Sequence, residues 1–199
     1  MIPPELILAS KSASRQAMLR AAGVPFAAVG SQIDEDAAKA SLGQLPPRDL
    51  ADALAELKAV KVSYLAPQAL VLGSDSLVAL ADGTRLDKPE NREEAAEHLR
   101  RMSGGVHELW SAAVMAEAGR PVWRHVERAR LHVRPVSPAF IDAYLGGEWP
   151  AIAGCVGCFR IEGPGVQLFS KIDGDHFTVL GMPLIPVLGY LRTRGVLPS

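Results

Sequence analysis

One acidic residue stands in the middle of a long apolar run. Residues 70–80 read LVLGSDSLVAL, and Asp75 is the only charged residue among them. A carboxylate is costly to bury unless a partner neutralises it. Gly73 lets another backbone or a ligand approach closely. We therefore favour a functional acid over the alternative, an Asp at an exposed strand end that makes a turn hydrogen bond.

Hydroxyl groups and an arginine gather at an expected helix start. Ser10, Ser12 and Arg15 follow the apolar run 5–9, and Ser14 is the expected N-cap. Two hydroxyls, a guanidinium and free helix amides together suit an anion. A plain N-cap with a surface arginine is an equal alternative. The standard glycine-rich phosphate loops are absent from the sequence.

The remaining charged candidates carry weaker signals. On spacing alone, the acidic run 34–36 is a solvated loop, Lys58 and Lys88 are surface residues, and His107 is an ordinary strand histidine. Carboxylate oxygens at 34–36 are nevertheless the hard ligands that Mg²⁺ prefers. They could gather the ion together with Asp75.

Two cysteines form a single C-x-x-C pair. Structural zinc needs four ligands, and no second Cys or His pair follows at useful spacing. A redox pair prefers a helix N-terminus, whereas Cys155 and Cys158 stand among glycines. We interpret both as buried small residues, and leave a redox or zinc protein as a distant alternative.

The elements that must position these groups alternate between strands and helices. A polar segment, 31–45, suits a loop or a short irregular helix. Strands are expected over 5–9, 24–29 and 70–80, with helices over 15–22, 46–65 and 90–101. There follow a hairpin of 106–117 and 121–133, a helix over 137–145, two short strands within 154–169 and a helix over 182–194. This order predicts an α/β fold with a mixed sheet.

Composition excludes several classes of protein. The 199 residues are 48% hydrophobic and 22% charged, with a formal net charge of -1. These proportions are typical of a globular protein and not of a disordered chain, collagen or coiled coil. A net charge this close to zero makes sequence-independent binding of nucleic acid through a basic surface unexpected. No apolar run reaches the roughly 20 residues of a membrane helix, and the N-terminus lacks a basic signal-peptide region, so we expect a cytoplasmic protein.

Taken in order, the segments resemble the Maf family of nucleoside triphosphate pyrophosphatases from Leu6 to Gly195. Each matching landmark is weak alone, but eight in the right order are specific. They are Ser10, Ser12 and Arg15; Ile33-Asp34-Glu35; Lys58; Gly73-Ser74-Asp75; Lys88-Pro89; Ser103, Gly104 and His107; Glu162-Gly163-Pro164-Gly165; and Gly181-Met182-Pro183-Leu184.

The resemblance implies a fold and a reaction. Residues 1–199 would form one Maf-like domain: an elongated mixed sheet flanked by helices, in two lobes around a nucleotide cleft, similar to the inosine triphosphatases. Family members hydrolyse nucleoside triphosphates to a monophosphate and pyrophosphate, as a house-cleaning activity. They need a divalent cation, here Mg²⁺ or Mn²⁺. Because members are often dimers, a homodimer is expected, with no nucleic-acid or membrane partner.

The resemblance also implies site roles. Asp75 would be the general base, and Glu35 with Asp75 would hold the metal. The substrate would be bound by Ser10, Ser12, Arg15, Lys58, Lys88 and His107.

Specificity would depend on Ser14, Ser76 and Glu162. Glu162 with Cys155 is similar to the branch that acts on 7-methyl-GTP, although that branch carries Trp and Gln in place of Ser14 and Ser76. A carboxylate accepts hydrogen bonds from a guanine edge, which favours a modified purine. The alternative function is a nucleotide-binding regulator of cell division with little turnover. We favour the enzyme because every proposed catalytic position is filled.

Overall fold

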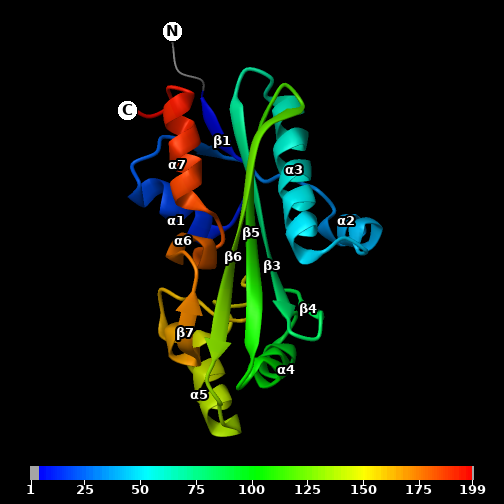
Figure 1. The fold of residues 1–199 in the computed structure, drawn as a ribbon, viewed down its shortest axis with the longest axis vertical. Coiled ribbons are helices and arrows are strands. Elements are labelled where there is room, and N and C mark those ends of the chain that lie inside the picture. The colour runs from blue at the N-terminus through cyan, green and yellow to red at the C-terminus, as the bar shows by residue number, and fades with distance from the viewer. Residues whose placement is uncertain (1–4, 199) are drawn as a thin grey trace. The chain divides into compact units, whose positions relative to one another are not determined.

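Seven strands form one mixed sheet in the computed structural model, which describes residues 5–198 (Figure 1). Residues 1–4, which begin the N-terminal segment expected to lack a signal peptide, and Ser199 lie outside these residues. The strand order is β2-β1-β3-β5-β6-β7, and β4 pairs with β3. β1 is parallel to β2 and β3, whereas β4 is antiparallel to β3 and β7 to β6. The α/β prediction with a mixed sheet is confirmed.

The elements have the following bounds. The strands are β1 (Leu6–Leu8), β2 (Ala27–Ala28), β3 (Leu70–Leu80), β4 (Arg85–Leu86), β5 (Val106–Glu117), β6 (Arg120–Val133) and β7 (Phe169–Asp173). The α-helices are α1 (Ala13–Ala21), α2 (Glu35–Leu42), α3 (Pro47–Leu65), α4 (Arg92–Met102), α5 (Pro138–Glu148), α6 (His176–Leu180) and α7 (Leu184–Thr193). A 3₁₀ helix, η1, covers Pro164–Leu168.

The chain forms two compact units. The first comprises the chain up to Ser76, Trp110–Glu127, and the residues from His176 onwards; the second comprises Leu77–Leu109 and Arg128–Asp175. Strands β3, β5 and β6 each contribute residues to both units. The single domain with a nucleotide cleft stays a prediction.

Alternation along β1 and β3 builds the core of the first unit. Successive strand residues point to opposite faces of a sheet. Leu6, Leu8 and Leu72 belong to a cluster that includes residues of α1 and α7. Ile7 and Val71 belong instead to a cluster with Val62 of α3. Figure 1 shows α1 and α7 on one side of these strands and α3 on the other. Both faces are covered, which explains why β1 and residues 70–72 of β3 are continuously apolar.

The hairpin of β5 and β6 closes as predicted. Its connection, Ala118-Gly119, has positive φ at both residues, +45° and +79°. Two such residues are typical of the type I′ turn, whose twist matches that of paired strands. The turn is anchored by Ser63, whose hydroxyl accepts a hydrogen bond from the Gly119 amide at 3.0 Å.

The prediction of two strands within 154–169 is wrong. Gly157 and Cys158 have φ of +80° and +59°, which extended strands do not allow. The segment forms turns and then η1, which begins at Pro164. The predicted strand over 24–29 is also reduced to Ala27–Ala28, while β4, β7 and α6 were not predicted.

The C-terminal helix α7 begins two residues later than predicted. Gly181 has φ of +108°, and Pro183 is the N-cap of α7, so the chain turns sharply before the helix. Among residues 5–198, no helix combines the length and apolar character needed to cross a bilayer.

Candidate active site

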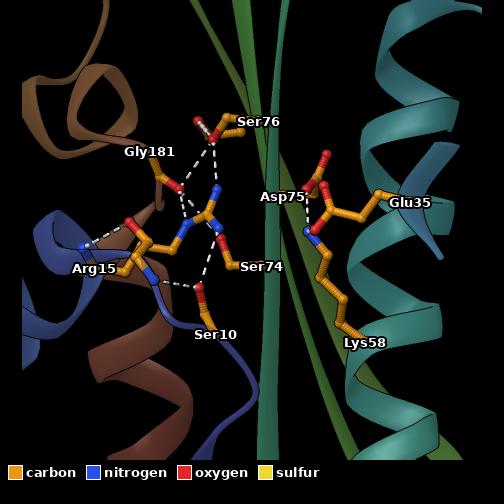
Figure 2. A network of polar contacts seen from close by, with 10 residues as sticks. Ser10, Arg15, Glu35, Lys58, Ser74, Asp75, Ser76 and Gly181 are labelled. Atoms are coloured by element: carbon orange, nitrogen blue, oxygen red, sulfur yellow. Dashed lines mark hydrogen bonds and ion pairs between the residues drawn. The ribbon is translucent and has the colours of Figure 1, made fainter. Parts of the chain in front are cut away.

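A buried ion pair joins β3 to α3. The Asp75 carboxylate lies 2.5 Å from Lys58 Nζ, and their side chains are only 9% and 6% exposed. Lys58 is therefore not the surface lysine expected from spacing alone. The ammonium also contacts Glu35 Oε1 at 2.8 Å (Figure 2). Removing one partner of such a pair leaves an uncompensated buried charge, so the three side chains depend on one another.

Glycine at position 73 allows this pair to form. A Cβ atom at Gly73 would lie 2.2 Å from the Ala55 carbonyl oxygen and 2.6 Å from the Ala59 amide nitrogen. The backbone of α3 thus passes directly against β3, at Ala55, three residues before Lys58, and at Ala59, the residue after it. The predicted close approach at Gly73 is made by a helix of the chain itself.

The acidic run is a helix start and not a solvated loop. Asp34 caps α2, since its side chain accepts a hydrogen bond from the Ala37 amide at 2.9 Å. Glu35 is then the first residue of the helix. Gln32 has φ of +50°, and its carbonyl accepts a hydrogen bond from Lys61 on α3. Lys58 and Lys61 therefore hold this segment at two points.

Arg15 lies in a polar cluster formed by α1, β3 and the turn before α7. Its Nε donates to the Gly181 carbonyl at 2.8 Å, and Nη2 donates to Ser76 Oγ at 3.1 Å. Nη1 donates to Ser10 Oγ at 3.4 Å. Burial lowers the pKa of the Arg15 guanidinium, and the negative charges of Asp75 and Glu35 oppose that shift. An arginine keeps its charge under these conditions.

The helix cap differs by two residues from the prediction. Ser12, not Ser14, is the N-cap of α1, and its hydroxyl accepts a hydrogen bond from the Arg15 amide at 3.5 Å. The hydroxyl of Ser14 donates instead to the Leu180 carbonyl at 2.9 Å. Ser10, Ser12 and Arg15 nevertheless converge, as the predicted anion cradle requires.

The two groups of residues lie on opposite sides of β3. Figure 2 shows Asp75 turned towards Lys58 and Glu35, while Ser74 and Ser76 turn towards Arg15. This follows from the alternation of side chains along a strand. One strand segment, 74–76, thus carries a carboxylate on one face and two hydroxyls on the other.

Three predicted residues belong to the second unit. Lys88 and Glu162 are exposed. His107 is 1% exposed, and its ring lies 6.3 Å from Phe159 and 6.2 Å from Phe169 between centroids. Neither of its ring nitrogens has a hydrogen-bond partner among the described residues. Burial lowers the pKa of His107 to about 4, so the ring is neutral. The substrate roles of these three residues stay predictions.

The cysteines lack the features of a reactive pair. Cys158 is buried, and its sulfur lies 3.5 Å from His98 Nδ1. Burial raises the pKa of Cys158 to about 12 and raises that of Cys155 as well, whereas reactive thiols have a lowered pKa. Within residues 5–198, no group of three His, Cys, Asp or Glu side chains is placed to hold a metal ion. These observations favour the interpretation of both as structural residues.

Comparison with known protein families identifies the family of this chain. The model of the family described as Maf-like protein matches residues 5–194. The chain belongs to this family. The match covers both units and every residue of the candidate site, which confirms the resemblance drawn from the eight landmarks.

Relatives in the Maf-like family are similar over almost their whole length. A "Nucleoside triphosphate pyrophosphatase" of Sphingopyxis alaskensis is 52% identical over 197 residues, covering 98% of this chain and 99% of the relative. A "Nucleoside triphosphate pyrophosphatase 1" of Jannaschia is 51% identical, covering 96% and 97%. A "7-methyl-GTP pyrophosphatase" of Brucella suis is 44% identical, covering 94% and 95%.

Sequence reasoning gave no site role to three contributors, although Ser74 and Gly181 stand among the family landmarks. Ser74 donates to the Gly181 carbonyl at 3.2 Å, and Ser111 lies 2.9 Å from Ser76 between hydroxyl oxygens. The Gly181 carbonyl itself is the third. Period-two alternation along β3 could have placed Ser74 with Ser76. No local signal could have joined Ser111 or Gly181 to Arg15, because their contacts span 35 to 166 residues.

Proposed function

We propose that this chain is a nucleoside triphosphate pyrophosphatase. It hydrolyses the bond between the α and β phosphates of a non-standard or modified nucleoside triphosphate, releasing a monophosphate and pyrophosphate. The observation that carries the proposal is the buried Asp75–Lys58 pair at 2.5 Å, joined by Glu35 at 2.8 Å. The names of the Maf-like relatives from Sphingopyxis and Jannaschia support the same reaction.

The residues present fit a divalent cation, Mg²⁺ or Mn²⁺. Glu35 and Asp75 converge on one ammonium, so two hard oxygen donors already face a shared positive charge. Mg²⁺ is usually held by one or two carboxylates, with substrate phosphates and water completing its shell. Glu35 and Asp75 would therefore hold the ion. When bound, the ion supplies positive charge to the phosphates and makes a coordinated water more acidic.

Each side chain then has a task in the hydrolysis. The reaction needs phosphate charge neutralised and a water molecule placed in line with the phosphorus. Asp75 accepts the proton of that water as general base. Lys58 neutralises the acidic pair, while Arg15, Ser10 and Ser12 bind phosphate oxygens. Lys88 would supply a further positive charge for binding the triphosphate.

The proposed substrate carries a modified purine, with 7-methyl-GTP as the leading example. Glu162 is exposed and offers only acceptor oxygens, which suit the N–H groups of a guanine edge. The Brucella suis relative, which is named for 7-methyl-GTP, supports this class. Ser14 is small where that branch carries Trp, which leaves more room for the base. The enzyme would act on free nucleotides in the cytoplasm as a homodimer.

Pyrophosphate release across a panel of nucleotides tests the reaction. The panel contains standard and modified nucleoside triphosphates with Mg²⁺ or Mn²⁺, and Asp75→Asn is the inactive control. We expect turnover concentrated on modified purine triphosphates and lost in the control. Nucleotide binding without any release would refute the enzyme and favour the regulator.

A substitution of Glu162 tests the substrate class separately. Glu162→Gln replaces two acceptors by one acceptor and one donor, so we expect kcat/KM to shift towards pyrimidine triphosphates by about tenfold. Glu93→Gln, which changes an exposed carboxylate on α4, is the matched control. Unchanged relative kcat/KM values across the panel would remove Glu162 from base recognition.

A further inference from the structure

Besides Ser10, the guanidinium of Arg15 is held by groups outside the proposed phosphate-binding residues. Its Nη2 donates to Ser76, and Ser76 lies 2.9 Å from the hydroxyl of Ser111. Ser111 is a fully buried residue of β5. Its hydroxyl also lies 2.8 Å from the Thr178 carbonyl oxygen. A line of contacts therefore runs from Arg15 into the interior of the first unit.

The hydroxyl hydrogens available along this line limit its direction. A serine hydroxyl has one hydrogen to donate, and a carbonyl oxygen can only accept. The hydrogen of Ser111 goes to the Thr178 carbonyl, so Ser111 offers Ser76 an acceptor oxygen. The single hydrogen of Ser76 is shared between that oxygen and the Gly181 carbonyl, which lies 3.1 Å away. Ser76 in turn accepts from Arg15. The hydrogen bonds thus run from Arg15 through Ser76 towards two carbonyl oxygens, those of Gly181 and Thr178, an arrangement in which each polarises the next.

The line closes into a ring through Gly181. The Gly181 amide donates to the same Thr178 carbonyl at 3.1 Å, and the Gly181 carbonyl accepts from Arg15 Nε. Ser74 and Ser76 also lie within hydrogen-bond distance of that carbonyl, at 3.2 and 3.1 Å, so it is the shared acceptor of the cluster. Gly181 has φ of +108°, a conformation suited to glycine, and an added Cβ would lie 3.3 Å from Ser76 Oγ. The ring therefore leaves the guanidinium little freedom to turn.

We propose that Ser111 is a positioning residue for Arg15 and acts through Ser76. Ser76 in this chain then orients the phosphate-binding arginine and does not read the nucleotide base, because its hydrogen and an acceptor site are already engaged. This inference rests on the proposed function, in which Arg15 binds the triphosphate. It assigns Ser111 a task in substrate binding although Ser111 touches no substrate.

Kinetics of Ser111→Ala test the proposal. Without Ser111, Ser76 keeps only the Gly181 carbonyl as an acceptor, so Ser76 and the guanidinium are held less firmly. We expect KM for the preferred triphosphate to rise roughly fivefold to tenfold, with kcat changed less than about twofold. The kcat/KM ratio between purine and pyrimidine triphosphates stays unchanged. The double variant Ser76→Ala with Ser111→Ala is no worse than Ser76→Ala alone, because both residues act through one chain.

Ser63→Ala is the matched control for loss of a buried hydroxyl. Ser63 is fully buried in the first unit, donates to the Val60 carbonyl and accepts from Gly119, outside the ring around Arg15. We expect it to lower thermal stability without changing KM. An unchanged KM in Ser111→Ala, an equal KM rise in Ser63→Ala, or a change in base preference would each overturn the proposal.

A binding measurement separates this inference from the proposed reaction. If the wild-type protein releases no pyrophosphate from any triphosphate, the reaction is wrong, but Arg15 can still bind phosphates. Calorimetry with inorganic pyrophosphate then compares the wild-type protein, Ser111→Ala and Ser63→Ala. About fivefold weaker binding by Ser111→Ala alone supports the positioning role, and equal affinities overturn it.

Discussion

Asp75 is a single residue with two roles: its carboxylate pairs with the Lys58 ammonium, and it is the proposed general base. Asp75→Asn keeps the size of the side chain but cannot accept a proton. We expect kcat to fall by at least about 100-fold, while the affinity for a non-hydrolysable triphosphate analogue stays within about tenfold. Stopped assays and calorimetry on the same preparation measure both quantities.

The control for this substitution is Asp49→Asn, an exposed carboxylate in the first turn of α3. It should leave both kcat and affinity unchanged. Near-normal kcat in Asp75→Asn would show that another group accepts the proton.

Individual residues were predictable to different degrees. Asp75 stood out because its charge interrupts an apolar strand. Lys58 carried a signal that spacing could have revealed: it follows Leu50 and Leu54 at steps of four, and all three face the interior. Ser111 carried none, since its partners Ser76 and Thr178 come from distant segments.

At the scale of elements, the contact between α3 and β3 depends on Gly73. Gly73→Ala would place a methyl group against the α3 backbone, 2.2 Å from the Ala55 carbonyl oxygen. The helix must move away, and Lys58 moves with it. We expect a loss of about 1–3 kcal/mol in unfolding free energy, together with reduced kcat. Urea unfolding and pyrophosphate release test the two effects.

Gly83→Ala is the comparison for Gly73→Ala. Gly83 lies in the turn between β3 and β4, where an added Cβ meets nothing within 4 Å. Its φ of +84° makes it a strained site for alanine, so stability should fall there too. Only Gly73→Ala should lower kcat. Equal kcat in both variants would show that the position of α3 does not control the site.

The start of β5 makes stability depend on pH through His107. Its pKa is about 4 when folded, against about 6.5 for an unperturbed histidine, so the unfolded chain binds more protons between these values. The stabilisation is complete above pH 6.5 and is lost as pH falls towards 4. We expect His107 to account for about 2 kcal/mol of lost unfolding free energy between pH 7 and pH 5.

Urea unfolding of the wild-type protein and His107→Leu at both pH values measures this dependence. The difference in unfolding free energy between pH 7 and pH 5 should be smaller in His107→Leu than in the wild-type protein, whatever the absolute stability of the variant. If this difference in unfolding free energy were the same in both proteins, the protonated His107 ring would have to be stabilised by a partner in the folded state.

Elements with strong periodicity were predicted well, and those determined by backbone conformation were not. β3, α3 and the long hairpin follow from apolar spacing and turn residues over ten or more positions. The segment 154–169 alternates small and apolar residues as a strand would, but positive φ at Gly157 and Cys158 prevents extension. A cysteine at position 158 does not indicate a positive φ in the way that a glycine would.

At the scale of the whole molecule, the two units are not separable pieces of chain. Each is assembled from distant segments, and β3, β5 and β6 continue from one into the other. No linker can therefore be cut to release either unit. We expect both to unfold in one cooperative transition, as is usual for small domains.

Tryptophan fluorescence can report on each unit alone. Trp110 and Trp123 belong to the first unit and Trp149 to the second. Trp149→Phe therefore reports on the first unit, and the double variant Trp110→Phe with Trp123→Phe reports on the second. Within each variant, the fluorescence midpoint in urea should coincide with that from circular dichroism. Separate midpoints would mean that the units unfold independently.

The segment Ser74-Asp75-Ser76 limits which insertions and deletions β3 can accept. Its hydroxyls and its carboxylate face opposite sides of β3 only because of their position in the two-residue repeat (Figure 2). Deleting one residue upstream in the strand would turn a serine towards Lys58 and the acid towards Arg15. Single exchanges at these positions weaken one contact at a time, whereas a one-residue deletion would invert both sides at once. The strand can therefore diverge by substitution but not by insertion or deletion.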